Sequence, residues 1–181
     1  MRVIGGSAKG TRLAPVPPGT RPLSDRAREG LFSSLAAVIP DAVCGDLFAG
    51  TGAVGIEALS RGAASCLFVD YSTRATRAIE ENLTLTKLEG RARVVRSDVR
   101  AALEREEGPF DVAFLDPPYE IDEGELASVL GLVAARLGPD GRFALTRPKG
   151  KDSMNVIPLH WHSARLLSYG DARIHVCRRQ N

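Results

Sequence analysis

The stretch that decides the fold is residues 46–55, with the sequence DLFAGTGAVG. It joins an apolar strand, predicted over 43–48, to a helix predicted over 55–61. Gly50 and Gly52 lack a Cβ atom, so a ligand can approach the backbone closely, and the following helix offers unpaired amide groups at its N-terminus. This order of strand, glycine turn and helix predicts an α/β fold with a ligand site at the carboxyl end of the strand.

The same alternation of strand and helix continues after this turn. Strands are predicted over 65–70, 93–96, 110–115 and 141–146, with helices over 72–88, 99–106 and 123–137 between them. Near the end, two extended segments, 164–169 and 172–177, are separated only by Gly170 and Asp171, which is a hairpin signal. The sequence therefore predicts a doubly wound, mostly parallel sheet with helices on both faces and a C-terminal antiparallel hairpin.

The segment before this sheet is basic and contains many prolines. Residues 1–13 are predicted to form a small β-hairpin, 15–22 an irregular Pro/Gly stretch, and a helix capped by Ser24 or Asp25 is predicted to reach about Ile39. Residues 1–30 carry six basic and two acidic side chains, whereas the whole chain has a net charge of only +2. We predict one domain over 1–181, in which 1–22 form a basic arm suited to phosphate, although a solvated surface with ion pairs would explain the same charges.

Several protein classes are disfavoured by composition. No apolar run approaches the roughly 20 residues of a membrane span, and the chain starts without an apolar signal segment, so a cytoplasmic location and no membrane partner are predicted. Cys44, Cys66 and Cys177 are odd in number and widely spaced, which argues against a disulfide framework or zinc site and favours burial as small apolar side chains. His160 and His162 lack a suitably spaced third ligand, so no metal is predicted.

Asp46 distinguishes two ligand classes that the glycines alone do not separate. Gly50, Gly52 and Gly55 also fit the fingerprint of dinucleotide-binding oxidoreductases. A carboxylate at the end of the strand can hold a cationic amine, such as the ammonium group of S-adenosylmethionine (SAM), and a nicotinamide dinucleotide has no matching group. We therefore predict a SAM site that includes Asp46, Gly50 and Gly52.

Two further acids follow predicted strands. Asp70 ends the second strand, where an acid accepts both ribose hydroxyls in doubly wound folds, but the same carboxylate could simply serve the N-terminus of the next helix. Asp98 follows the third strand and is predicted either to accept the adenine amino group or to cap the helix that starts at Val99. Both alternatives remain open for each residue.

The most informative stretch is Asp116-Pro117-Pro118-Tyr119, at the end of the fourth strand. Two consecutive prolines fix a rigid turn and leave the carbonyl groups near Asp116 and Pro117 free as acceptors. The exocyclic amine of a nucleobase is a poor nucleophile, because its lone pair is delocalised into the ring. A carboxylate and a carbonyl that accept its two N–H groups would direct the lone pair at a methyl donor, while Tyr119 stacks on the extruded base. An ordinary proline loop is the alternative.

With these motifs in place, the chain resembles, nearly end to end, the bacterial 16S ribosomal RNA guanine-N2 methyltransferases of the D type. The resemblance rests on RVIGG (2–6), RPLSDRARE (21–29), DLFAGTG (46–52), EALSRGA (57–63), Asn82 and DPPY (116–119). It implies a seven-stranded sheet, SAM bound around 46–52 including Ala49 and Thr51, and Asp116, Pro117 and Tyr119 at the catalytic position. It also implies a small-subunit rRNA guanine as target and contact between the hairpin and either rRNA or the assembling subunit.

Two departures accompany the resemblance. The second-strand acid is Asp70, where Glu is more usual, and the stretch after Thr146 is divergent, so no functional residue is carried over from it. Arg21 and Arg26 are expected either to clamp target phosphates or bases or to form ion pairs with Asp25 and Glu29.

The predicted function is methyl transfer from SAM to the N2 amine of a guanine in 16S rRNA, by a monomer. Three alternatives remain. An adenine-N6 DNA methyltransferase would use the same tetrapeptide, but the chain has no spare length for a target-recognition segment. An oxidoreductase would leave residues 116–119 unexplained. A non-catalytic RNA-binding or ribosome-assembly factor is the third.

Overall fold

The computed structural model describes residues 1–15, 22–105, 108–151, 153 and 155–180. The predicted Pro/Gly stretch over 15–22 therefore lies almost entirely outside the described residues. The elements are, in order, α1 (Asp25–Ser34), β1 (Val43–Leu47), α2 (Ala53–Ser60), β2 (Ser65–Asp70), α3 (Thr73–Thr86), the short 3₁₀ helix η1 (Glu89–Arg91), β3 (Ala92–Arg96), α4 (Val99–Arg105), β4 (Phe110–Leu115), α5 (Glu123–Arg136), β5 (Leu137–Pro148), β6 (Trp161–Tyr169) and β7 (Ala172–Arg179).

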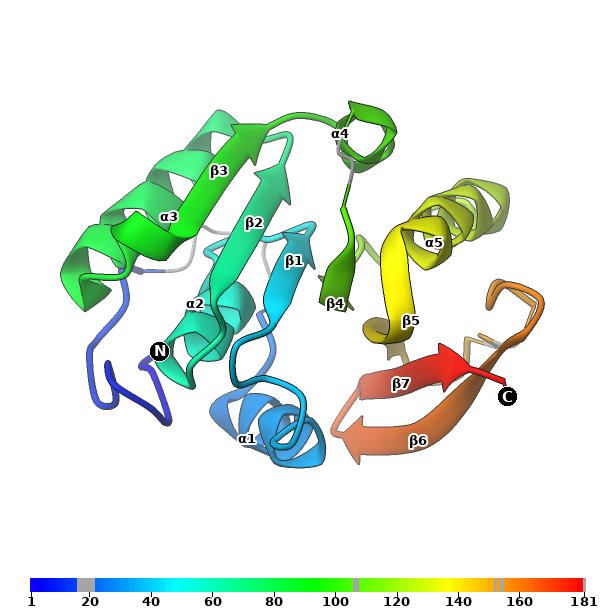
Figure 1. Cartoon of the computed structure of the whole chain (residues 1–181), viewed down its shortest axis with the longest axis horizontal. Helices are drawn as coiled ribbons and strands as arrows, with labels where there is room; N and C mark the ends of the chain where they lie inside the picture. Colours follow the sequence, from blue (N-terminus) through cyan, green and yellow to red (C-terminus); the bar gives the residue numbers. More distant parts are fainter. Residues whose placement is uncertain (16–21, 106–107, 152, 154, 181) are drawn as a thin grey trace.

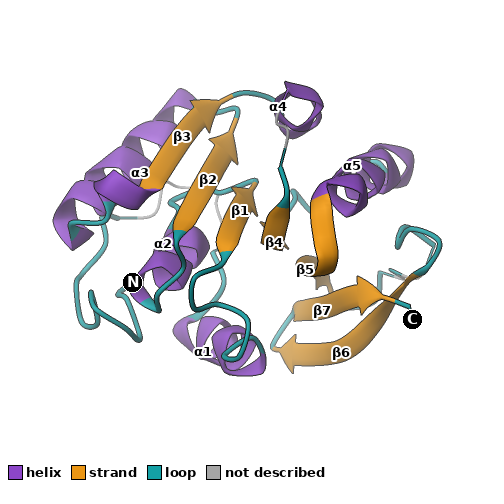
Figure 2. Ribbon diagram, in the orientation of Figure 1, coloured by secondary structure: helices purple, strands orange, loops and turns teal. Residues whose placement is uncertain are grey.

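The seven strands form one sheet in the order β3-β2-β1-β4-β5-β7-β6 (Figures 1 and 2). Strands β3, β2, β1, β4 and β5 are parallel, and β7 runs antiparallel between β5 and β6. The predicted fold, a mostly parallel sheet that ends in an antiparallel hairpin, is confirmed. The chain reverses its direction of winding between β1 and β4, and open α/β sheets bind ligands at the carboxyl edge beside such a reversal.

Helices cover both faces of the sheet, as Figure 1 shows. One buried cluster joins α1, α2 and α3 to the sheet through residues such as Phe32, Ile56 and Ile79. A second cluster joins α4 and α5 to the other face, with Leu103 and Leu130 among its members. The two layers hold the carboxyl ends of the parallel strands in a fixed arrangement. Cys44, Cys66 and Cys177 are all buried within strands, as predicted.

Three predicted boundaries were wrong. The first helix ends at Ser34 rather than near Ile39, because the Ser34 hydroxyl donates to the Leu31 carbonyl (2.7 Å) and the chain continues in turns that bury Leu35 and Ile39. Strand β5 starts at Leu137, before the Gly-Pro-Asp sequence that suggested a loop. Between the Phe110–Leu137 and Val112–Arg142 pairs, β5 inserts extra residues as a bulge. Strand β6 begins at Trp161, three residues earlier than expected.

The N-terminal segment forms one antiparallel bridge, between Arg2 and Arg12, within the predicted hairpin. Backbone hydrogen bonds from Val3 to Thr11 (3.0 Å) and from Gly10 to Val3 (2.9 Å) close this loop. Within the described residues, no helix is long and apolar enough to cross a membrane.

Candidate active site

A cavity of about 840 Å³ opens at the carboxyl edge of the sheet, beside the reversal between β1 and β4. Nine of the predicted site residues line it, because the strand ends that carry them all meet at this edge. They are Asp46, Ala49, Gly50, Thr51, Asp70, Asp98, Asp116, Pro117 and Tyr119. The sequence missed further lining residues, among them Leu23, Arg28 and Phe48.

The glycine turn has one open and one packed glycine. Gly50 has a φ of +56°, and a Cβ atom placed on it would meet no atom within 4 Å, so its backbone faces open space in the cavity wall. Gly52 has a φ of +75° and caps α2, and its hypothetical Cβ would lie 3.1 Å from Ile79 and 3.3 Å from Phe68. Gly52 does not line the cavity. Its place in the structure is therefore that of the residue that shapes the turn.

Asp46 is the most deeply buried acid of the cavity, with 4% of its surface exposed. One of its carboxylate oxygens accepts a hydrogen bond from the Gly55 amide at 2.8 Å. The pKa of Asp46 is raised to about 8, chiefly by burial; the hydrogen bond from Gly55 lowers it, and the charges of Asp116 and Asp70 contribute to the rise. A buried carboxylate with other acids nearby is stabilised by a cation, and the ammonium and sulfonium groups of SAM fit that requirement.

Asp70 uses both carboxylate oxygens to organise the turn. One accepts from the Gly50 amide (2.9 Å) and the other from the Ser72 amide (2.9 Å). The cap of α3 is Ser72, whose hydroxyl accepts from Ala75, so Asp70 is not the capping residue. Each oxygen of Asp70 retains a second lone pair for a hydroxyl donor.

Asp98 is exposed at the edge of the cavity. Its carboxylate accepts from the Ala101 amide at 3.0 Å, which is the capping role that the sequence left open. Asp98 thus serves the start of α4 and also lines the cavity, so the geometry is compatible with both of its predicted roles.

The Asp116–Tyr119 turn forms the wall that belongs to β4. Burial raises the pKa of Asp116 to about 7, although part of its side chain is exposed to the cavity. The turn continues through a hydrogen bond from the Ile121 amide to the Pro118 carbonyl (3.1 Å). The ammonium group of Lys151 donates to the Tyr119 carbonyl at 3.0 Å, so the segment after β5 lies against this turn.

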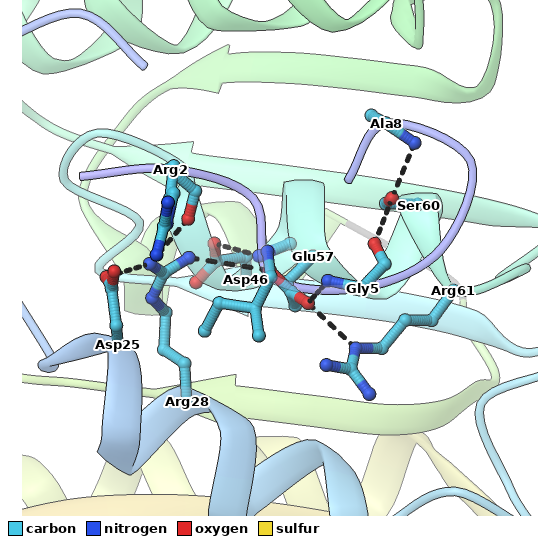
Figure 3. Close-up of polar contacts among 11 residues, drawn as sticks. Arg2, Gly5, Ala8, Asp25, Arg28, Asp46, Glu57, Ser60 and Arg61 are labelled. Carbon is cyan, nitrogen blue, oxygen red and sulfur yellow. Dashed lines mark hydrogen bonds and ion pairs between the residues drawn. The ribbon is translucent and has the colours of Figure 1, made fainter. Parts of the chain in front are cut away.

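The N-terminal arm is fastened to α2 by Glu57, whose side chain is fully buried (Figure 3). Its two oxygens accept from the amides of Ile4 (2.9 Å) and Gly5 (2.8 Å). The same carboxylate binds Arg61 at 2.8 Å and lies 3.5 Å from Arg28. Because α2 starts at the glycine turn, the arm is anchored to the helix that follows the predicted SAM site.

A second anchor joins the arm directly to the glycine turn. The carboxamide of Asn82, which is fully buried in α3, accepts from the Ala14 amide (2.7 Å) and donates to the Thr51 carbonyl (2.9 Å). A single side chain therefore fixes both the end of the arm and a peptide group of the cavity wall. Asn82 was noticed in the sequence, but only as part of a family resemblance.

Of the two arginines predicted to clamp the target or to form ion pairs, the structure describes only Arg26. Arg21 lies outside the described residues. Arg26 is exposed and lines a separate groove of about 440 Å³, together with Arg2 and Lys9, rather than the main cavity. The ion pair with Asp25 is made by Arg28, at 2.6 Å, and Arg28 lines the main cavity. Arg28 follows Asp25 by three residues on α1, and this spacing is the sequence signal that could have identified the pair.

Among the described residues, no group of three or more His, Cys, Asp or Glu side chains is placed to hold a metal ion. Trp161 packs against Phe143, with ring centroids 5.2 Å apart, so it belongs to the core of the sheet.

The fold and the cavity define a class I methyltransferase, with a glycine turn after β1 and a DPPY turn after β4. The chain belongs to the family of the ribosomal RNA small subunit methyltransferase D proteins, whose model, described as "Conserved hypothetical protein 95", matches residues 1–178.

Individual relatives agree with this assignment. The chain is 37% identical over 164 residues to ribosomal RNA small subunit methyltransferase D of Escherichia coli K12, covering 89% of this chain and 81% of that protein. It is 32% identical over 165 residues to the protein of the same name from Haemophilus influenzae, covering 89% and 84%. The solved structure named "Putative methyltransferase yhhF from Escherichia coli" superposes with a TM-score of 0.84 at 35% identity, covering 99% of this chain and 98% of that one.

Proposed function

We propose that the protein transfers a methyl group from SAM to the N2 amine of a guanine in 16S rRNA. One observation carries the proposal: the DPPY turn and the glycine turn with Asp46 line the same cavity. A base presented to the first turn would therefore lie beside a ligand held by the second. The names of the relatives in E. coli and H. influenzae support small-subunit rRNA as the substrate.

The residues of β1 and β2 fit SAM by their chemistry. The buried Asp46 carboxylate suits the ammonium group, the open backbone at Gly50 allows close approach, and Asp70 suits the ribose hydroxyls. Ala49, Thr51 and Asp98 complete this part of the wall. When bound, SAM supplies a methyl group on an activated sulfonium centre.

The residues of the DPPY turn act on the amine of the target. The carboxylate of Asp116 and the carbonyl of Pro117 accept its two N–H groups, so the nitrogen lone pair is withdrawn from the ring and becomes available for attack. Tyr119 stacks on the extruded base and excludes water. No covalent intermediate with the protein is required, and the proton that the methylated amine must lose would pass to the Asp116 carboxylate. The contribution of the protein is alignment, which can be worth roughly 7–11 kcal/mol at its limit.

The decisive experiment incubates the purified protein with methyl-labelled SAM and small ribosomal subunits, or their rRNA, from a strain that lacks the corresponding gene. Nuclease digestion and mass spectrometry then identify the modified nucleoside. The expected product is one N2-methylguanine in 16S rRNA. Transfer to adenine in duplex DNA, or no transfer to any small-subunit substrate, would refute the proposal.

A further inference from the structure

The segment that follows β5 carries two lysines, one of which contacts the DPPY turn. Lys151 reaches the Tyr119 carbonyl with its ammonium group (3.0 Å), and the Lys149 amide donates to the Asp171 carbonyl (2.7 Å) in the β6–β7 turn. Both lysine side chains are exposed. They therefore lie on the carboxyl edge of the sheet, where a nucleotide at Tyr119 would continue into its neighbours.

Two arginines lie beneath these lysines, on adjacent strands. Arg147 of β5 pairs directly with Arg173 of β7 in the antiparallel register. Directly opposed side chains project from the same face of a sheet, about 4.5–5.5 Å apart at Cβ, so two like charges are juxtaposed. The alternation along β5, in which Phe143 and Leu145 pack in the α5 cluster, assigns Arg147 to the α5 side.

The guanidinium group of Arg147 is buried without an acceptor. Its exposed surface is 1%, and none of its three nitrogens has a hydrogen-bond partner within the part of the chain that the structure describes. An arginine does not lose its proton in a protein, so the charge persists, and a buried unpaired charge is strongly unfavourable. Among the described residues, no ion pair involves Arg147, Lys149, Lys151 or Arg173. We call these four residues the β5-edge basic cluster.

Because these side chains form no ion pair among the described residues, they are available to an anion. A buried charge is screened by salt much less than an exposed one, so Arg147 reinforces the positive potential at Lys149 and Lys151. Phosphate groups are the anions that accompany a nucleobase, and lysine and arginine contacts to phosphate position a strand without reading its sequence.

We propose that Lys149, Lys151 and Arg173 of the β5-edge basic cluster bind the phosphodiester backbone of the RNA strand that carries the target guanine, with the buried charge of Arg147 behind them. This inference rests on the proposed RNA substrate and assigns a role to the segment after Thr146, from which the family resemblance carried over no functional residue. The cluster holds the backbone while Tyr119 stacks on the base, so that the strand is gripped on the β5 side of the DPPY turn.

The test measures binding of an unmodified 16S rRNA transcript by filter retention at several KCl concentrations. Lys149→Gln and Arg173→Gln are expected to weaken binding about threefold to tenfold near 0.1 M salt, and each lost phosphate contact lowers the salt slope by about one. Lys87→Gln is the matched control and should bind like wild type, because Lys87 is an exposed lysine at the C-terminal end of α3. The affinity for S-adenosylhomocysteine should stay the same in all three variants. RNA binding that is equal in Lys149→Gln, Arg173→Gln and Lys87→Gln would overturn the inference.

Arg147→Met supplies a second and independent readout. Replacing an unpaired buried charge with an apolar side chain of similar length should raise the melting temperature while RNA binding falls. Misfolding would move stability in the opposite direction, so it is distinguishable. Asp152, which lies outside the described residues, supplies the contrary outcome. If Arg147→Met and Asp152→Asn both lower the melting temperature, Arg147 is neutralised by an acid of its own chain, and the inference is overturned.

Failure of this inference and failure of the proposed function have different signatures. If wild-type protein methylates 16S rRNA while the Lys149 and Arg173 variants bind RNA normally, only the phosphate surface is refuted. If wild-type protein binds the transcript through these residues but transfers no methyl group to any small-subunit substrate, only the proposed function is refuted.

Discussion

The carboxyl group of Asp116 acts electrostatically on that of Asp46 across the cavity. The pKa of Asp46 is raised to about 8, chiefly by burial, and the charge of Asp116 contributes to this rise. Burial also raises the pKa of Asp116 to about 7. The two acids that are expected to face the cofactor and the target amine therefore titrate close to neutral pH.

Ligand affinity should depend on pH because of this pair. A cationic ammonium group favours ionised carboxyl groups, so binding releases protons wherever Asp46 is still protonated in the free protein. The affinity for S-adenosylhomocysteine is expected to rise between pH 6 and pH 8, by at most about tenfold per pH unit for one ionising group. Titration calorimetry at pH 6, 7 and 8 measures this change. Asp46→Asn should bind more weakly and with a flatter profile; an unchanged slope in that variant would contradict the assignment.

The stability of the ligand-free protein should show the opposite trend. The pKa of Asp46 is raised from 3.8 to about 8, so the folded state holds a proton that the unfolded state has lost. This contribution to stability is complete below pH 3.8 and disappears as the pH rises through about 8. The free energy of unfolding in urea is therefore expected to differ less between pH 5 and pH 8 in Asp46→Asn than in wild type. At pH 8 the variant should be the more stable of the two proteins. Equal pH dependence in both proteins would mean that Asp46 titrates normally.

Methyl transfer should require the carboxylate at position 116. Asp116→Asn keeps the size of the side chain but removes the negative charge that strengthens the hydrogen bond from the target amine, and its NH2 group can turn a donor toward that amine; misaligned chemistry of this kind costs at least about a hundredfold. The single-turnover rate on small-subunit rRNA is the appropriate measurement. Asp98→Asn, at the edge of the same cavity, is the control and should affect ligand affinity more than the rate. A wild-type rate in Asp116→Asn would remove this residue from the mechanism.

The arm should detach when its buried anchors are lost. Asn82→Leu leaves the Ala14 amide and the Thr51 carbonyl without their partner, which should lower the free energy of unfolding by about 2–4 kcal/mol. Trypsin should then cut faster after Lys9 and Arg12, and mass spectrometry of the fragments measures this rate. Glu57→Gln is expected to act in the same direction, since Arg28 and Arg61 lose their carboxylate.

Glu80→Gln is the matched control for Glu57→Gln, because Glu80 is exposed on α3. It should leave both the stability and the trypsin cleavage pattern unchanged. If Glu57→Gln and Glu80→Gln behave alike, the carboxylate of Glu57 does not hold the arm.

Two helical glycines should respond in opposite ways to the same substitution. A Cβ atom on Gly30 in α1 would lie 1.7 Å from the Tyr169 hydroxyl, so Gly30→Ala is expected to destabilise the protein by about 1–3 kcal/mol. A Cβ atom on Gly131 in α5 would meet nothing within 4 Å, so Gly131→Ala should stabilise by about 0.5–1 kcal/mol. Thermal unfolding compares the two. Destabilisation by Gly131→Ala would show that α5 is crowded at this position.

The sequence predicted which strand-end residues meet at one edge of the sheet better than it predicted the boundaries of elements. Asp46, Asp70 and Asp116 could be brought together without coordinates, because parallel strands deliver the residues that follow them to one edge. The early end of α1 could not be predicted, since it depends on how Leu35 and Ile39 are buried in turns rather than on helix propensity. The start of β5 was missed because the Gly-Pro-Asp sequence is typical of a loop, whereas in the structure these residues form a bulge within the strand.

The sequence also did not predict which charged and polar side chains are buried. Glu57, Asn82 and Arg147 are each exposed by 1% or less, although their residue types are usually found at the surface. Their partners, or the lack of partners in the case of Arg147, come from segments far apart in the chain, such as residues 4–5 for Glu57. Local patterns do not encode such pairings, so Arg28 and Glu57 were not identified as part of the surroundings of the site.

The double anchoring of residues 1–14 has a practical consequence for protein engineering. If residues 1–14 were removed, the Glu57 carboxylate and the Asn82 carboxamide would together lose three hydrogen bonds from backbone amides. Such a truncated protein would be a damaged fold rather than a minimal enzyme. Attempts to redirect the enzyme to another RNA should therefore graft changes onto the outer side chains of this segment and keep its backbone in place.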